Sequence, residues 1–202
     1  MDSYLLHDET DVQAMRDLLQ RLKRPPTVED FEEVIQLKST WESTRLWREG
    51  DRLAGFAFVD EYNNLQFEID PQFDVRLIEE MVGWGIYRMQ RRNQATDAKD
   101  TLDHCCVAEH SRRIAALERL GFVRQELRTL RYERSSEQPL PAAEIPPGFR
   151  LRCVEGEHEA ERLAALHRAA FGSEHMTMEG RLAIIRAPHY QRDLDLVAVT
   201  PD

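Results

Sequence analysis

The spacing of apolar residues at the start of the chain predicts a short strand followed by two helices. Residues 3–7 suit the strand, and Thr10 with Gln13 forms a capping-box pattern that opens the first helix. Arg24-Pro25-Pro26 ends that helix, because proline lacks a backbone N–H and fixes the backbone. A second helix opens at Thr27 with Asp30. The apolar positions of the two helices recur at intervals of three and four residues: Val12, Met15, Leu18, Leu19 and Leu22, then Val28, Phe31, Val34 and Ile35.

The spacing then changes to that of strands. Residues 44–49 alternate, Gly50-Asp51 suits a tight turn, and residues 52–60 form a strongly apolar run, which together predict a β-hairpin. Asn63-Asn64 predicts the next turn, because asparagine tolerates left-handed dihedral angles. Residues 65–69 form a third strand, so we expect an antiparallel meander of three strands.

A long helix is predicted over residues 75–92, capped by Asp74. Gly83 and Gly85 lower its intrinsic helix propensity by about 1 kcal/mol each, and we expect them to allow close packing of the helix on the sheet. Its apolar stripe consists of Leu77, Ile78, Met81, Val82, Gly85, Ile86 and Met89. Residues 93–100 are polar and are expected to form a loop.

Three further elements complete this part of the chain. Residues 102–107 predict a short buried strand, and residues 109–120 a helix that ends at Gly121 in the left-handed conformation. Residues 123–134 are extended and highly charged, which predicts one bent strand or two short ones.

Residues 135–148 mark a boundary, because four prolines and several small residues are typical of a linker. Beyond it the pattern restarts with a strand, two helices and a strand over residues 149–154, 157–171, 177–187 and 194–199. This order repeats that of residues 3–60. We therefore expect a first unit at 1–134, a linker at 135–148, and at 149–202 the incomplete start of a second unit.

Composition narrows the class of protein. With 42% hydrophobic residues, the 202-residue chain can bury a core, and its formal charge of −10 disfavours nucleic-acid binding. The clustered Arg88, Arg91 and Arg92, and Arg112 with Arg113, are interpreted as solvated helix faces. No apolar run approaches the ~20 residues of a membrane helix, and residues 1–10 do not resemble a secretory signal. We expect a cytoplasmic protein that binds neither nucleic acid nor membrane.

The cysteines and histidines do not suggest a metal site. Cys105, Cys106 and Cys153 are odd in number, which excludes a simple disulfide framework, and their spacing does not suit zinc. We expect the first two to be buried thiols. His104, beside them, is predicted to point away from Cys105 and is not assigned a role. We expect no metal.

The order of elements over residues 1–134 resembles the GNAT N-acetyltransferase superfamily. Residues 117–122, Leu-Glu-Arg-Leu-Gly-Phe, are similar to the Tyr-Glu-Lys-Leu-Gly-Phe sequence that ends the last helix of that family. The resemblance implies an α/β (α+β) fold with a mixed, mostly antiparallel sheet and helices on both faces. The second strand–helix–helix–strand set resembles the start of another copy, as in tandem, mycothiol-synthase-like GNAT proteins.

The resemblance also implies a site for acetyl-CoA as co-substrate and an unknown amine as acceptor. In the family the backbone of the fourth strand, here Phe67 and Ile69, pairs with the pantetheine arm, and Arg76 would face the pyrophosphate. Glu68 takes the position of a catalytic base, although strand alternation would also allow it to face solvent. His110 stands where the family usually has asparagine, either as an acid or substrate ligand or as an exposed helix-capping residue.

The sequence departs from the family at two points. Residues 70–76 lack the glycines of the phosphate loop and present Asp74 where a phosphate would lie. Leu117 replaces the tyrosine that often protonates the leaving thiolate. Two hypotheses follow: an N-acyltransferase whose first unit is degenerate in CoA binding, with its substrate between two units, or a non-catalytic scaffold, dimerisation unit or ligand sensor. An unpaired edge at 194–199 favours a homodimer through residues 149–202.

Overall fold

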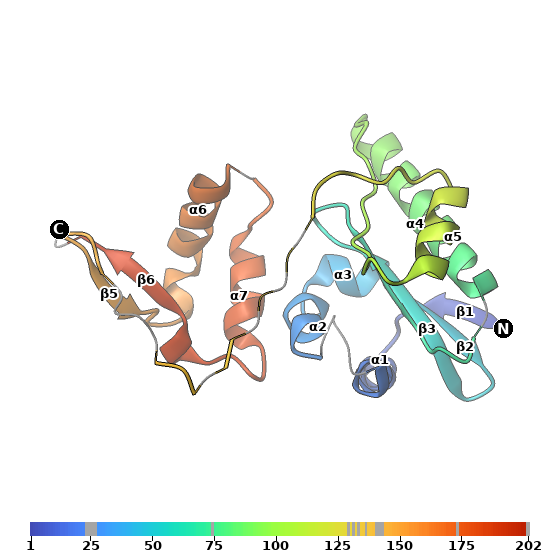
Figure 1. Cartoon of the computed structure of the whole chain (residues 1–202), viewed down its shortest axis with the longest axis horizontal. Coiled ribbons are helices and arrows are strands. Elements are labelled where there is room, and N and C mark those ends of the chain that lie inside the picture. The colour runs from blue at the N-terminus through green and yellow to red at the C-terminus, as the bar shows by residue number, and fades with distance from the viewer. Residues whose placement is uncertain are drawn as a thin grey trace.

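The computed structural model describes residues 1–22, 28–73, 75–128, 130, 132, 134–135, 137–139, 144–172 and 174–200. Figure 1 shows the elements arranged around two separate sheets. In chain order they are β1 (Asp2–Leu5), α1 (Glu9–Leu22), α2 (Val28–Ile35), α3 (Lys38–Ser43), β2 (Arg45–Glu49), β3 (Arg52–Val59), β4 (Leu65–Ile69), α4 (Val75–Thr96), α5 (Ser111–Arg119), β5 (Arg150–Cys153), η1 (Glu157–Glu159), α6 (Ala160–Phe171), α7 (Met178–Arg186), η2 (Arg192–Leu194) and β6 (Leu196–Val199).

The first sheet has the order β1-β2-β3-β4, and every neighbouring pair is antiparallel. The predicted meander is therefore confirmed. Gly50 and Asn63 occupy the two predicted turns with φ angles of 59° and 64°, the left-handed region that glycine and asparagine tolerate best.

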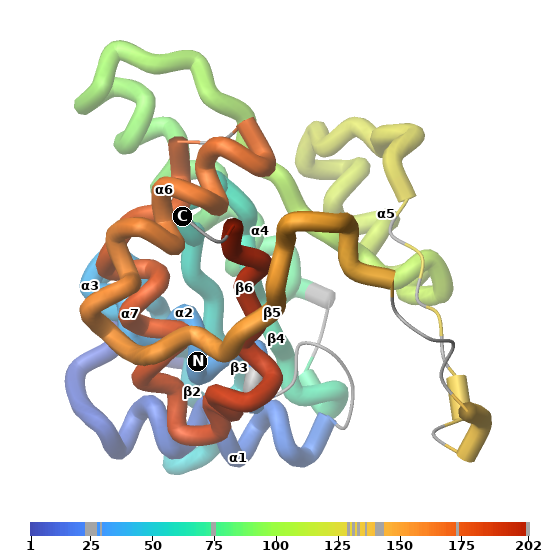
Figure 2. The backbone as a smooth tube through the Cα atoms, turned by 90° about the vertical axis from the view of Figure 1, so that its left-hand side faces the viewer, coloured from blue at the N-terminus to red at the C-terminus, as the bar shows by residue number. Residues whose placement is uncertain are grey.

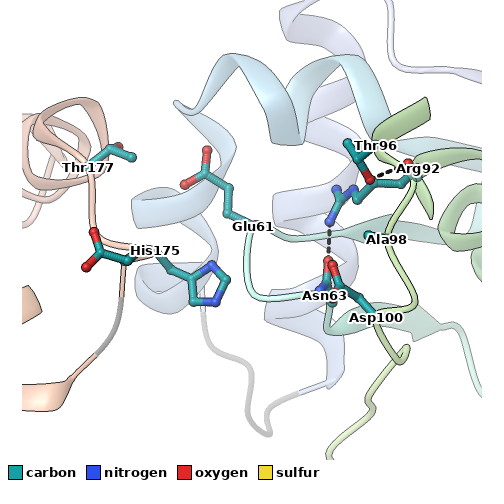
Figure 3. Close-up of a pocket in the computed structure, with 9 residues that line it drawn as sticks. Glu61, Asn63, Arg92, Thr96, Ala98, Asp100, His175 and Thr177 are labelled. Atoms are coloured by element: carbon teal, nitrogen blue, oxygen red, sulfur yellow. Dashed lines mark hydrogen bonds between the residues drawn. The ribbon is translucent and has the colours of Figure 1, made fainter. Parts of the chain in front are cut away.

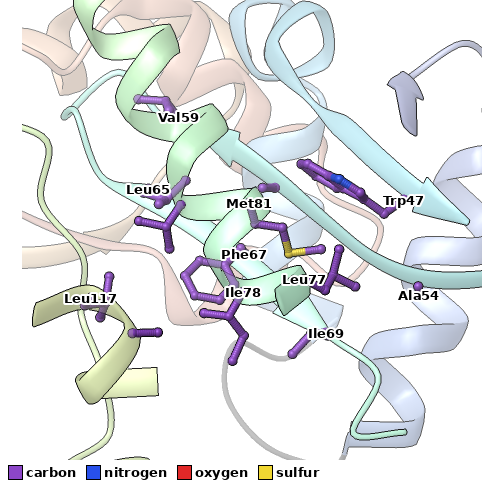
Figure 4. Packing of buried hydrophobic residues seen from close by; sticks show 13 residues of the cluster. Trp47, Ala54, Val59, Leu65, Phe67, Ile69, Leu77, Ile78, Met81 and Leu117 are labelled. Carbon is purple, nitrogen blue, oxygen red and sulfur yellow. The ribbon is translucent and has the colours of Figure 1, made fainter. Parts of the chain in front are cut away.

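Helices cover both faces of this sheet, because side chains alternate along each strand. On one face, Leu46, Phe56 and Phe58 pack with the apolar residues of α1 and α2. On the other face, strand and helix residues form a second core with α4 and α5 (Figure 4). Its buried members are Trp47, Ala54, Ala57, Val59, Leu65, Phe67, Ile69, Leu77, Ile78, Met81, Val82, Ala116 and Leu117.

Two helix boundaries differ from the prediction. Asp8, and not Thr10, caps α1, since its Oδ1 accepts hydrogen bonds from the backbone N–H of Thr10 at 2.8 Å and of Asp11 at 3.3 Å. α4 continues to Thr96, so the loop predicted for residues 93–100 begins four residues later. The predicted caps Thr27 and Asp74 lie outside the described residues.

Close packing of α4 on the sheet depends on Gly85 and Gly55. A Cβ at Gly85 would lie 2.7 Å from Leu65 Cδ1, which confirms the expected role of this glycine. The same expectation was wrong for Gly83, because nothing lies within 4 Å of a Cβ placed there. Like Gly85, Gly55 has no room for a side chain, because a Cβ there would lie 2.6 Å from the Glu68 carbonyl oxygen. The sequence analysis did not predict this contact.

The buried strand predicted at residues 102–107 is wrong in its extent. The segment makes one parallel bridge, between Asn64 and Asp103, and is not a strand. Its residues still alternate in exposure, so Cys105 is exposed and Cys106 only partly buried, contrary to the prediction of two buried thiols. The strand or strands predicted over 123–134 are also absent from the described residues of that range, where Val123 and Leu127 are largely exposed.

The second sheet consists of β5 and β6, which pair antiparallel with α6 and α7 between them in sequence. Its strand–helix–helix–strand order matches the one predicted. α7 lies beside α2 (Figures 1 and 2), where Gln36 Nε2 donates a hydrogen bond to the Ala183 carbonyl at 3.3 Å. Within the described residues, no helix is long and apolar enough to cross a membrane.

Candidate functional site at the outer edge of β4

The outer edge of β4 presents backbone groups away from β3. Leu65 N–H donates to the Asp103 carbonyl at 2.7 Å, so the backbone groups of Leu65 point outward. Because these directions alternate along a strand, the N–H and C=O groups of Phe67 and Ile69 point outward as well. The two residues expected to hold a coenzyme arm therefore have the orientation that such a contact needs.

This edge opens beyond its first residues. Asp103 N–H donates to the Asn63 carbonyl at 3.0 Å, which completes the parallel bridge at the start of β4. No further bridge joins the two segments in the described part of the chain, so their backbone pairing ends at Asp103.

His104 lies where the backbone pairing of the two segments ends. Its ring stacks on Phe67 with centroids 4.7 Å apart, and its Nδ1 lies 2.7 Å from the Leu65 carbonyl oxygen. Nε2 is buried, with no hydrogen-bond partner among the described residues. Burial lowers the pKa of His104 to about 4, because the charged imidazolium would lose its hydration there. The sequence could have indicated this burial, because His104 falls on the same side of the alternating segment as Leu102 and Cys106. The sequence analysis assigned His104 no role.

His104 should make the stability of the fold depend on pH. Its pKa is depressed in the folded state relative to about 6.5 in the unfolded chain, so its contribution is fully present above pH 6.5 and is lost as the pH falls towards 4. We expect about 2–3 kcal/mol of unfolding free energy to be lost across this window. Urea unfolding of wild type and His104→Gln at pH 7 and pH 4.5 measures the difference. The same pH dependence in wild type and His104→Gln would contradict this prediction.

Glu68 and Arg113 form a buried ion pair across the same edge. Glu68 is 3% exposed and Arg113 8% exposed, with Nη2 and Oε2 3.4 Å apart. The Arg113 guanidinium also lies over the Phe67 ring, 4.4 Å from its centroid. Because Glu68 and Phe67 point to opposite faces of β4, the Arg113 side chain passes around the outer edge. The alternative that Glu68 faces solvent is wrong, and so is the interpretation of Arg113 as part of a solvated helix face.

The loop after β4 is organised around Asp70, which is 3% exposed. Its carboxylate lies 2.6 Å from Arg52 and 3.7 Å from Arg21. It also accepts the backbone N–H of Gln72 at 3.1 Å, while Phe73 N–H donates to the Asp70 carbonyl at 2.9 Å. Two amides of this loop, those of Gln72 and Phe73, are thus used by Asp70.

The remaining site residues lie at the ends of helices. Arg76 is exposed in the first turn of α4. His110 occupies the N-cap position of α5, as expected of a helix-capping residue. Its side chain makes no capping hydrogen bond. Leu117 is buried in the core below the sheet.

A separate hollow of about 500 Å³ lies at the other end of β4 (Figure 3). It is lined by the β3–β4 turn, the end of α4 and residues 174–177. Asn63, in this turn, is five residues from Glu68, which corresponds to about 17 Å along an extended strand. The described lining residues are Glu61, Asn63, Arg92, Thr96, Ala98, Asp100, Glu174, His175 and Thr177.

Comparison with solved structures identifies the fold. The crystal structure of a GCN5-related N-acetyltransferase from Sphaerobacter thermophilus superposes on 98% of this chain with a TM-score of 0.61 and 21% sequence identity. The chain has a GNAT-like fold. The alignment covers 67% of the Sphaerobacter chain. TTHA1254 from Thermus thermophilus matches 67% of this chain and 99% of its own chain at 16% sequence identity, with a TM-score of 0.44. Neither the family models nor the curated proteins that were compared gave a match.

The residues of this GNAT-like fold suit an acyl-CoA only in part. The outward backbone groups of Phe67 and Ile69 fit a pantetheine arm, but Arg113 passes through the opening where that arm would lie. The loop does not fit a pyrophosphate, because the buried carboxylate of Asp70 already accepts one of its amides and would repel a second anion. Among the described side chains, no group of three or more histidine, cysteine or acidic residues is arranged to hold a metal ion.

Proposed function

We propose that the protein belongs to the acyl-CoA-dependent N-acyltransferases and takes part in acetyl transfer from acetyl-CoA to an amine. The observation that carries this proposal is the GNAT-like arrangement at β4, where a parallel bridge at Asp103 is followed by an open edge with outward backbone groups. The coenzyme would supply the activated acetyl group. Glu68 as a base and His110 as an acid or substrate ligand stay predictions.

The first unit, residues 1–134, is on this proposal degenerate in CoA binding. Asp70 supports this, because it replaces an anionic ligand in the loop with a carboxylate of the chain itself. Arg113 supports it by crossing the open edge. Leu117 supports it because a buried aliphatic side chain has no proton to donate to a thiolate.

A non-catalytic GNAT-like scaffold, sensor or dimerisation module is the second candidate, favoured by the Arg113–Glu68 pair that crosses the edge. On this reading residues 149–202, the start of a second unit after the linker 135–148, would pair with a second copy. Leu151 and Leu196 support such pairing, since they lie on one face of the second sheet and are 48% and 53% exposed. Light scattering that gives a monomer at micromolar concentration would count against the dimer.

Acetyl-CoA titration combined with a thiol-release assay tests the proposal. We expect calorimetry to show saturation only at millimolar acetyl-CoA, because the loop contributes no phosphate contact, and amine-dependent thiol release at that concentration. Binding at micromolar acetyl-CoA would contradict the degenerate first unit. Folded protein that releases no thiol with any of a panel of primary amines would reject the enzyme and leave the scaffold.

A further inference from the structure

Three arginines line a second hollow at the end of α4, away from the site at β4. Arg91 and Arg92 lie three and four residues after Arg88, so both are neighbours of Arg88 on one side of the helix. Together with Val59, the last residue of β3, they line a hollow of about 370 Å³. Val59 is 2% exposed and provides an apolar floor. From the sequence these arginines were interpreted as a solvated helix face. The structure shows that they also line a concave surface.

The described residues that line this arginine pocket include no carboxylate. Across the ranges that the structure describes, Arg88, Arg91 and Arg92 form no ion pair. Arg92 Nη1 donates instead to two neutral oxygens. One is the Asp60 carbonyl at 3.0 Å, and the other is Asn63 Oδ1 at 2.6 Å (Figure 3). The three arginines therefore concentrate positive charge in this hollow, in a chain whose formal net charge is −10.

The geometry also holds part of the pocket in place. The two hydrogen bonds of Arg92 fix its guanidinium against the β3–β4 turn, so less side-chain entropy is lost when a ligand binds. Arg88 is only partly exposed and Arg91 is exposed, so both guanidinium groups remain accessible.

We propose that the arginine pocket binds the phosphate group of a small phosphorylated molecule. Guanidinium forks match the oxygens of phosphate in pairs, and three of them together balance an anion with two or three charges. The hollow is larger than one phosphate and falls at the lower end of the roughly 300–1,000 Å³ typical of small-molecule pockets.

This pocket is distinct from the loop that follows β4. Arg88 is 13 residues beyond Val75, the first residue of α4, which places it about 20 Å further along the helix axis. The proposal consequently does not depend on acetyl-CoA binding at β4, and failure of either proposal leaves the other unaffected.

Calorimetry with inorganic pyrophosphate tests the arginine pocket. The full chain is titrated at fixed ionic strength, with sodium chloride and citrate as comparison salts, because screening alone weakens any charge contact. We expect sub-millimolar pyrophosphate binding that is weakened about tenfold or more in the double variant Arg88→Gln/Arg91→Gln. The matched control, Arg112→Gln/Arg124→Gln, removes the same charge from exposed positions and should bind like wild type.

Three results would overturn the proposal. Equal loss of affinity in the control variant would reduce the effect to net charge. Citrate binding as tightly as pyrophosphate would show that phosphate is not the preferred group. Absence of saturation with folded wild-type protein would remove the site. Far-ultraviolet circular dichroism establishes whether each variant is folded. If the double variant does not fold, the single variant Arg91→Gln, at an exposed position, replaces it in the titration.

Discussion

Gly55→Ala should lower the free energy of unfolding by about 3 kcal/mol, near the upper end of overpacking effects. The added Cβ would lie 2.6 Å from the Glu68 carbonyl oxygen and 3.3 Å from Ile69 Cα, and would also contact Met81 Cε. Met81 can move its flexible end, but the β4 backbone cannot withdraw without losing its pairing with β3. Urea denaturation followed by circular dichroism measures the change.

Gly83→Ala is the matched control for this prediction. The same methyl group is added to an exposed position of α4 with nothing within 4 Å, so alanine should stabilise the helix by up to about 1 kcal/mol. If the two variants had the same stability, the close approach of β3, β4 and α4 at Gly55 would be wrong.

Arg113→Met should destabilise the fold by up to about 3 kcal/mol, because it removes a positive partner of the buried Glu68 carboxylate. Glu68 and Arg113 are 3% and 8% exposed, so water does not replace the lost contact. Methionine keeps much of the length and apolar packing of the arginine stem.

The double variant Arg113→Met/Glu68→Met separates charge from packing. Removal of both charges should recover most of the lost stability, because two apolar side chains of similar volume often replace a buried ion pair at little cost. Additive losses in a double-mutant cycle would show that the two residues do not interact. Surface Arg119→Met, whose partner Glu79 is 43% exposed, should change stability by less than about 1 kcal/mol.

The sequence predicted most of the fold because spacing and turn chemistry are local properties. The hairpin at Gly50, the turn at Asn63 and the stripe of α4 follow directly from residue types and intervals. The strand expected at 102–107 failed for a physical reason: an alternating apolar segment forms a strand only where a neighbour pairs with it, and here the pairing stops at Asp103.

The candidate site was less accessible to sequence reasoning. Phe67 and Ile69 were placed on the correct edge because strand alternation fixes backbone direction. The Arg113–Glu68 pair joins residues 45 positions apart, and no local pattern encodes which arginine reaches a given carboxylate. His104 was passed over for a similar reason, since its burial depends on Phe67, in a distant strand.

The β3–β4 turn connects parts of the molecule that are otherwise far apart. From the arginine pocket, Arg92 donates a hydrogen bond to the Asp60 carbonyl of this turn. At the start of the β4 edge, the Asp103 N–H donates to the Asn63 carbonyl. The Tyr62 ring meets His175, beyond the linker, with centroids 5.0 Å apart. A fluorescent or isotopic label in this one turn would therefore report on events at three different surfaces.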